Sequence, residues 1–84
     1  MNIIRDINVK DIEESIVELR KYVQEESIDP LLSVLEALKQ DPNNESLLVS
    51  LSETFMALGI VQGAVLTYAP YLSVILSNNL FEDE

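Results

Sequence analysis

The fold is decided by an uncharged stretch of 28 residues, numbered 54–81, which reads TFMALGIVQGAVLTYAPYLSVILSNNLF. All five Lys and Arg residues of the chain lie before this stretch. A stretch this long and apolar must leave water, and it can do so by entering a core, a partner protein or a lipid bilayer. The residues on either side of it, and the pattern within it, bear on the choice among these three kinds of burial.

Composition limits what the remaining sequence can build. The chain has 84 residues, 48% of them hydrophobic, and it contains no Cys, His or Trp. We expect a single domain over residues 1–84. A core this small gives only marginal stability unless another interaction adds to it. Without Cys, neither a disulfide nor a thiolate metal site can provide that interaction. We therefore predict oligomerisation, with no cofactor and no metal.

The charge balance favours one class of partner. The net charge is −10, from 15 acidic and 5 basic residues. Such a chain repels nucleic-acid phosphates and anionic membrane surfaces, whereas it attracts basic proteins. The first six residues, MNIIRD, show no positive region followed by an apolar run, as a signal peptide would. We expect a cytoplasmic protein that binds neither nucleic acid nor membranes directly.

Apolar residues recur at helical spacing in the first half of the chain. One predicted helix covers residues 9–26, with Asn8 as its N-cap. A second predicted helix takes Asp29 as its N-cap and Pro30 as its first residue, and it ends at the break formed by residues 41–44. These two helices are expected to form an antiparallel hairpin.

The second half predicts another antiparallel hairpin. Its first helix covers residues 45–58 after an Asn cap, and Gly59 is expected to stop it in the left-handed conformation. Its second helix begins near Ile60 and ends at residues 78–79. Pro70 interrupts it, and a proline within a helix costs about 3 kcal/mol unless the helix bends or restarts. We therefore predict an all-α fold of four helices with a kink at Pro70, and flexible ends at residues 1–8 and 79–84.

The chain also divides into two blocks of 34 residues, 11–44 and 45–78. The second block carries an ordered set of large, small and aromatic residues: Leu48, Leu51, Phe55, Gly59, Ala64 and Tyr68. This pattern resembles the tetratricopeptide-repeat family, whose units are helical hairpins of this length. Ser52 and Tyr71 depart from the residues the family prefers, and the first block matches only at Ala37 and Pro42.

The resemblance implies a fold and a binding mode. In the fold, Ala64 would be the small residue at which two helices approach closely, with Phe55 and Tyr68 filling the space on either side. The binding mode would be capture of a peptide or helix in a groove lined by the first helix of each repeat. The groove positions would be Ser15, Tyr22, Val49, Glu53 and Met56. The alternative, that these are ordinary surface or core positions, stays open.

Two other classes of function are less favoured. Residues 55–76 are long enough to cross a bilayer as a single-span anchor. However, Gly59, Gln62 and Pro70 lower the hydropathy of this segment, and no Lys or Arg flanks it. For catalysis, the acids of the first helix fall on its polar face, and the chain has no phosphate-binding loop or nucleophile–base pair. We therefore predict that the protein is not an enzyme.

The favoured function is a small acidic protein–protein interaction or adaptor module that forms a homodimer through its C-terminal helix. The apolar residues of that helix cover more than one face, so a second copy or a partner is expected to bury one of them. The predicted interface comprises Met56, Leu66, Tyr71, Val74 and Phe81. Two alternatives stay open. Pro70 can fold the last turns back onto the domain's own core, or the protein can be an acidic inhibitor or nucleic-acid mimic that binds a basic protein site.

Overall fold

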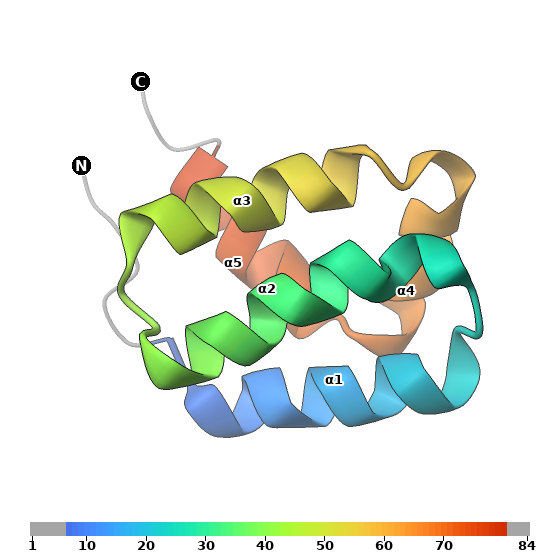
Figure 1. The fold of residues 1–84 in the computed structure, drawn as a ribbon, viewed down its shortest axis with the longest axis horizontal. Helices are drawn as coiled ribbons and strands as arrows, with labels where there is room; N and C mark the ends of the chain where they lie inside the picture. The colour runs from blue at the N-terminus through green and yellow to red at the C-terminus, as the bar shows by residue number, and fades with distance from the viewer. Residues whose placement is uncertain (1–6, 81–84) are drawn as a thin grey trace.

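The computed structural model describes residues 7–80, with side chains for residues 7–77. The described chain forms five α-helices: α1 (Val9–Tyr22), α2 (Asp29–Gln40), α3 (Glu45–Met56), α4 (Gln62–Tyr68) and α5 (Tyr71–Leu80). Two 3₁₀ turns, η1 (Glu26–Ile28) and η2 (Gly59–Val61), precede α2 and α4. Figure 1 shows α1, α2 and α3 side by side, with α5 behind α2. The predicted all-α class is confirmed.

Two helices begin at asparagine caps, as the sequence predicts. The Asn8 side-chain oxygen accepts hydrogen bonds from the N–H groups of Lys10 and Asp11, at 2.9 and 3.3 Å. The Asn44 side-chain oxygen accepts one from the N–H of Leu47 at 3.2 Å. Each cap satisfies backbone donors that have no partner within their own helix. The positions where α1 and α3 begin are therefore set by local sequence.

The start of α2 differs from the prediction. The residue before it is Ile28, and no side chain caps the helix. Asp29 is its first residue rather than its N-cap, because the chain already has helical backbone angles at Ile28, the last residue of η1. The predicted Asp29 cap is wrong. Ile28 itself is buried in the core, which explains why the chain takes this path.

The first helix is also shorter than residues 9–26. It ends at Tyr22, and Val23 has an extended backbone conformation. The break allows both Val23 and Ile28 to enter the core, although they lie on either side of an exposed, polar segment, residues 24–27. Burial of these two side chains favours ending α1 at Tyr22 over continuing it by another helical turn.

Gly59 has a φ of +60°, so the predicted left-handed conformation is confirmed. Beyond Gly59, however, the segment Gly59–Tyr68 turns by 107° relative to α3. An antiparallel hairpin would require the chain to reverse its direction almost completely. Instead α4 runs to α1 and contacts it. The predicted arrangement of four helices as two antiparallel hairpins is therefore not confirmed.

Pro70 divides the predicted fourth helix into two separate helices. The chain leaves α4 at Ala69, whose φ of −136° and ψ of 65° are not helical. A residue before proline disfavours the α conformation, because the proline ring crowds it. The N–H groups of Leu72 and Ser73 then bond to the carbonyls of Ala69 and Pro70, both at 3.0 Å, and restart the helix. The break takes the place of the predicted kink.

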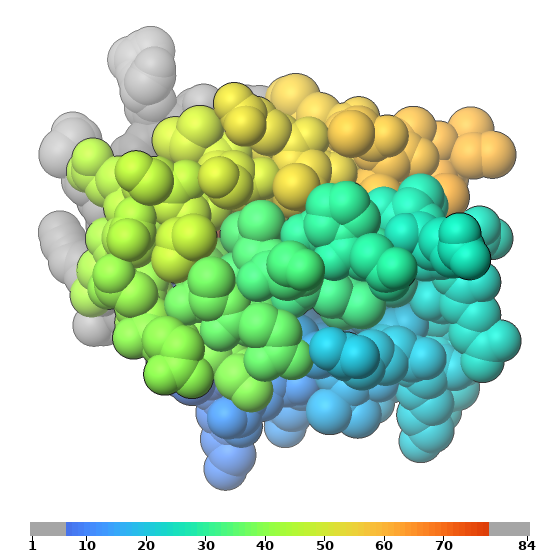
Figure 2. All heavy atoms as spheres, in the orientation of Figure 1, coloured from blue at the N-terminus to red at the C-terminus, as the bar shows by residue number. Residues whose placement is uncertain are grey.

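The core takes apolar side chains from all five α-helices. Its members from the uncharged stretch are Leu58, Val65, Ala69, Leu72, Ile75 and Leu76. The last helix therefore packs back onto the domain's own core, one of the two alternatives to the dimer prediction. Seen from the α2 side, the side chains of α1, α2 and α3 cover α5 (Figure 2). Ile7, within a predicted flexible end, is buried, while residues 1–6 and 81–84 lie outside the described residues.

Two candidate binding grooves

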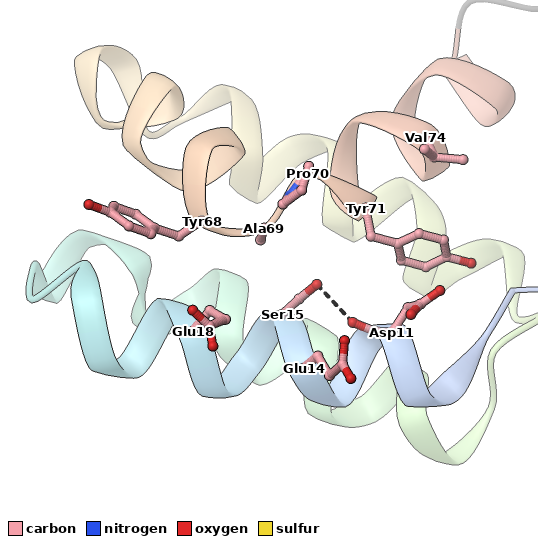
Figure 3. A pocket seen from close by; sticks show the side chains of 9 residues that line it. All are labelled: Asp11, Glu14, Ser15, Glu18, Tyr68, Ala69, Pro70, Tyr71 and Val74. Atoms are coloured by element: carbon pink, nitrogen blue, oxygen red, sulfur yellow. Dashed lines mark hydrogen bonds between the residues drawn. The ribbon is translucent and has the colours of Figure 1, made fainter.

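The first candidate site is a hollow between α1 and the junction of α4 and α5, shown in Figure 3. Its volume is about 340 Å³. We call it the acidic groove, and define it by its lining residues: Asp11, Glu14, Ser15, Glu18, Tyr68, Ala69, Pro70, Tyr71 and Val74. A second hollow adjoins it along α1 and shares Glu14, Glu18 and Tyr68 with it; Lys10, Glu13 and Val17 complete its lining.

One wall of the acidic groove is a single face of α1. Its acidic residues, Asp11, Glu14 and Glu18, recur at spacings of three and four, which places them in a row along the helix. Figure 3 shows the side chain of Ser15 pointing toward the α4–α5 junction. The Ser15 hydroxyl is buried and donates a hydrogen bond to the carbonyl of Asp11 at 2.9 Å. This wall therefore combines three carboxylates with a buried, hydrogen-bonded hydroxyl.

The opposite wall is apolar and aromatic. It exists because the chain breaks at Pro70, which brings the end of α4 and the start of α5 to the same side of α1. The Tyr71 hydroxyl accepts a hydrogen bond from the N–H of Asn8 at 2.8 Å, so the ring is held against the start of α1. Val74 follows one turn later and is 46% exposed. Together Pro70, Tyr71 and Val74 add apolar surface to the lining of the groove that holds the three carboxylates.

A pair of stacked tyrosines, one at the end of α1 and one at the end of α4, connects the two walls. The rings of Tyr22 and Tyr68 lie 5.0 Å apart, centroid to centroid, with 18° between their planes. Both side chains are exposed. The Lys21 ammonium lies 5.3 Å from the centroid of the Tyr22 ring. The aromatic pair therefore already carries one cation on its surface.

Two of the basic residues lie elsewhere. Glu36 of α2 forms ion pairs with Arg20 and with Lys39, each at 3.3 Å. Neither base lines the acidic groove, whose described lining has three carboxylates and no Lys or Arg. The negative charge of this groove is therefore not neutralised from within its own lining.

The second candidate site lies between α3, α4 and α5 and has a volume of about 420 Å³. We call it the uncharged groove, because its described lining contains no acid or base: Ser52, Phe55, Met56, Gln62, Leu66, Ser73, Leu76 and Ser77. The Gln62 side chain donates hydrogen bonds to the carbonyls of Phe55 and Met56, at 3.2 and 3.3 Å. These bonds satisfy the last turn of α3 and fix one end of the groove.

The structure divides the predicted interface residues between the two grooves. Met56 and Leu66 line the uncharged groove, whereas Tyr71 and Val74 line the acidic groove. Phe81 lies outside the described residues. The division arises because α5 buries its central stripe in the core and presents a different edge to each groove.

The residues implied by the repeat resemblance are also separated. Ser15 lines the acidic groove and Tyr22 stacks beside it, but Val49 and Glu53 are exposed on α3 and line neither groove. Ala64, expected at a close helix approach, is exposed to solvent. Membership of the tetratricopeptide-repeat family stays a prediction.

Sequence reasoning missed the acids of the acidic groove. The acids of the first helix, Glu14 and Glu18 among them, are predicted to lie on a polar face in water, because nothing in α1 itself indicates that α4 and α5 border that face. The spacing of three and four among Asp11, Glu14 and Glu18 was the available signal. Among residues 7–80, no group of three or more acidic side chains is arranged to hold a metal ion.

The described residues contain no single helix long and apolar enough to cross a bilayer. Within this part of the chain, only the pair formed by α3 and Gly59–Tyr68, bent by 107°, has the length and composition of a span when the two helices are taken together. Comparison of the chain with protein-family models, curated proteins and solved structures gave no match.

Proposed function

We propose that the protein is a small protein–protein interaction module that associates with a second copy of itself through the uncharged groove. The observation that carries this proposal is the exposure of two large apolar side chains at and just after the end of α3, one of which lines that groove. Met56 lines the groove and is 62% exposed, and Ile60 follows α3 and is 98% exposed. Exposed apolar side chains beside a hollow are typical of a surface that another protein covers.

Charge favours a second copy at this surface. Two chains that each carry a net charge of −10 repel one another, and the repulsion is smallest where the contacting surfaces hold no carboxylates. The uncharged groove is such a surface, since its described lining contains no acid or base. In a two-fold arrangement, the same patch meets itself, so Met56 of each copy can enter the groove of the other. The flexible thioether of methionine suits an irregular apolar hollow.

Molar mass as a function of concentration tests the proposal. Light scattering coupled to size-exclusion chromatography should give a mass above the 9.5 kDa of one chain, rising with concentration. Met56→Glu should return the mass to that of a monomer, because it places a charge in the interface of each copy. A mass of one chain at every concentration would contradict the proposal.

A matched control is available on the same helix. Val49 of α3 is 55% exposed but does not line the uncharged groove, so Val49→Glu adds the same charge at another site. It should leave the mass unchanged. If Val49→Glu disrupts association as strongly as Met56→Glu, net charge rather than this groove controls the oligomeric state. Circular dichroism of both variants should show unchanged helix content.

A further inference from the structure

The acidic groove has a charged side and an apolar side, and a single partner with basic and apolar side chains can contact both. Carboxylates form its α1 wall, and apolar and aromatic side chains form the wall at the α4–α5 junction. We propose that this groove binds an amphipathic helix of another protein, with Lys or Arg residues along one edge of an aliphatic stripe. The proposal concerns a different surface from the uncharged groove and does not depend on self-association.

The carboxylates match a helix in their spacing. Asp11, Glu14 and Glu18 lie along α1 at intervals of three and four residues, so the row extends about 10 Å at 1.5 Å per residue. A helix lying alongside α1 presents its own side chains with the same repeat. Basic residues at positions i, i+3 and i+7 of a partner helix can therefore each face one carboxylate. An extended peptide, which rises about 3.3 Å per residue, would match this row less regularly.

The apolar wall opposite α1 is the reason for proposing an aliphatic stripe on the partner helix. The pyrrolidine ring of Pro70 and the side chain of Val74 are exposed at the junction, and the ring of Tyr71 lies between them along the chain. These groups offer no charge to a ligand. Aliphatic side chains of a bound helix would cover them and remove their apolar surface from water. A purely charged ligand, such as a polyamine, would leave this wall exposed.

The stacked tyrosines offer a further contact to a basic side chain. Tyr68 lines both hollows along α1 and stacks on Tyr22. Lys21 already lies 5.3 Å from the centre of the Tyr22 ring, a distance at which a cation is attracted to the ring face. An Arg or Lys near the end of the partner helix can use the exposed part of this aromatic pair in the same way.

Charge also excludes the competing occupants of this groove. A nucleic acid would bring phosphates toward a row of carboxylates, and a second copy of this chain would bring a net charge of −10. A basic helix is attracted to the same row, and long-range attraction speeds its encounter with the groove. The partner is therefore expected to be a different protein.

Fluorescence anisotropy with a labelled synthetic peptide tests the proposal. The probe is a helical peptide with Lys at positions i, i+3 and i+7 beside a stripe of Leu; a peptide of the same composition, scrambled so that Lys and Leu share no face, is its comparison. At physiological ionic strength, the patterned peptide should bind about tenfold more tightly than the scrambled one. Equal binding of the two peptides would overturn the proposal. So would displacement of the labelled peptide by spermidine as effective as displacement by the unlabelled patterned peptide, when the two competitors are compared at equal concentration of positive charge.

Matched variants locate the binding surface. The double variant Glu14→Gln, Glu18→Gln should weaken binding about tenfold. Glu45→Gln, Glu53→Gln removes the same two charges from exposed positions on α3 and should change binding less than about twofold. Val74→Ser should also weaken binding, since it removes apolar surface from the opposite wall. If the α3 pair weakens binding as much as the α1 pair, the peptide recognises only net charge and the groove is not its site.

A final measurement separates this proposal from self-association. The Met56→Glu variant should bind the patterned peptide as tightly as the unmodified chain does. Amide chemical shifts in NMR spectra should change on peptide addition around Glu14–Glu18 and Tyr68–Val74. If they change instead around Met56 and Leu66, the peptide occupies the uncharged groove, and the acidic groove is not a docking site.

Discussion

The Tyr71 hydroxyl accepts a hydrogen bond from the backbone N–H of Asn8 at 2.8 Å, across 63 positions of sequence. Asn8 is the N-cap of α1, and Tyr71 is the first residue of α5. The N–H of an N-cap residue is often satisfied by a side chain three residues later. Here a distant tyrosine accepts it, so the bond joins the beginnings of two helices.

Removing this hydroxyl should destabilise the domain without disturbing its packing. Tyr71→Phe keeps the ring but takes away the acceptor, and we expect the free energy of unfolding to fall by about 1 kcal/mol. Urea denaturation followed by circular dichroism measures the change. Tyr68→Phe removes a hydroxyl from an exposed ring that keeps its stacking, and should have almost no effect. Equal losses in the two variants would show that the Asn8–Tyr71 bond does not contribute.

The two glycines should respond oppositely to the same substitution. Gly59 has a φ of +60°, so Gly59→Ala should lower the free energy of unfolding by about 1–2 kcal/mol through backbone strain alone, since no atom lies within 4 Å of the added methyl group. Gly63 lies in α4 with equally open surroundings. Gly63→Ala should raise the same quantity by about 0.4–1 kcal/mol. Thermal melts of both variants compare the signs directly, and a stabilising Gly59→Ala would contradict the left-handed turn.

Asn44 should contribute more than its neighbour Asn43. The Asn44 side chain accepts a hydrogen bond from the N–H of Leu47 and donates one to the Asp41 carboxylate at 3.0 Å. It therefore ties the connection between α2 and α3 to the first turn of α3. Asn44→Ala should lower the free energy of unfolding by about 1 kcal/mol. Asn43 is exposed, and Asn43→Ala should change it by no more than about 0.5 kcal/mol. Chemical denaturation distinguishes these values, and similar values for both would argue against the cap.

Substitutions within α5 test whether this helix belongs to the core of its own chain. Leu72 is fully buried, so Leu72→Ala should lower the free energy of unfolding by about 2–5 kcal/mol. Val74, two residues later, is half exposed, and Val74→Ala should change it by no more than about 0.5 kcal/mol. Denaturation at the lowest workable protein concentration keeps self-association out of the result. A mild effect of Leu72→Ala would mean that α5 does not pack on its own domain.

Local signals predicted the features that depend on one residue's own preferences. Asn8 and Asn44 cap helices because their side chains reach backbone donors two or three residues ahead. Gly59 adopts a positive φ because it has no Cβ to oppose it. Asp29 failed as a cap although its residue type was suitable, because burial of Ile28 shifted the start of α2 by one residue.

The candidate sites were less predictable because they depend on how distant elements pack. The sequence identified Pro70 as an interruption, but not that the chain would separate there into two helices. It also could not give the 107° turn after α3, which brings α4 to α1 instead of alongside α3. These two changes of direction decide which side chains face Glu14 and Glu18. They also explain why Leu66 and Val74, assigned to one interface, line different grooves.

The packing of α4 and α5 on α1 has a consequence for the order of folding. The pairs α1–α2 and α2–α3 are adjacent in sequence, whereas 39 residues separate α1 from α4 and 48 separate it from α5. Distant contacts form slowly, because a long loop must close before they stabilise the chain. We therefore expect the first three helices to associate early and the α4–α5 segment to dock last. The acidic groove then exists only in the finished domain, so a ligand of this groove binds the completed fold in preference to its folding intermediates.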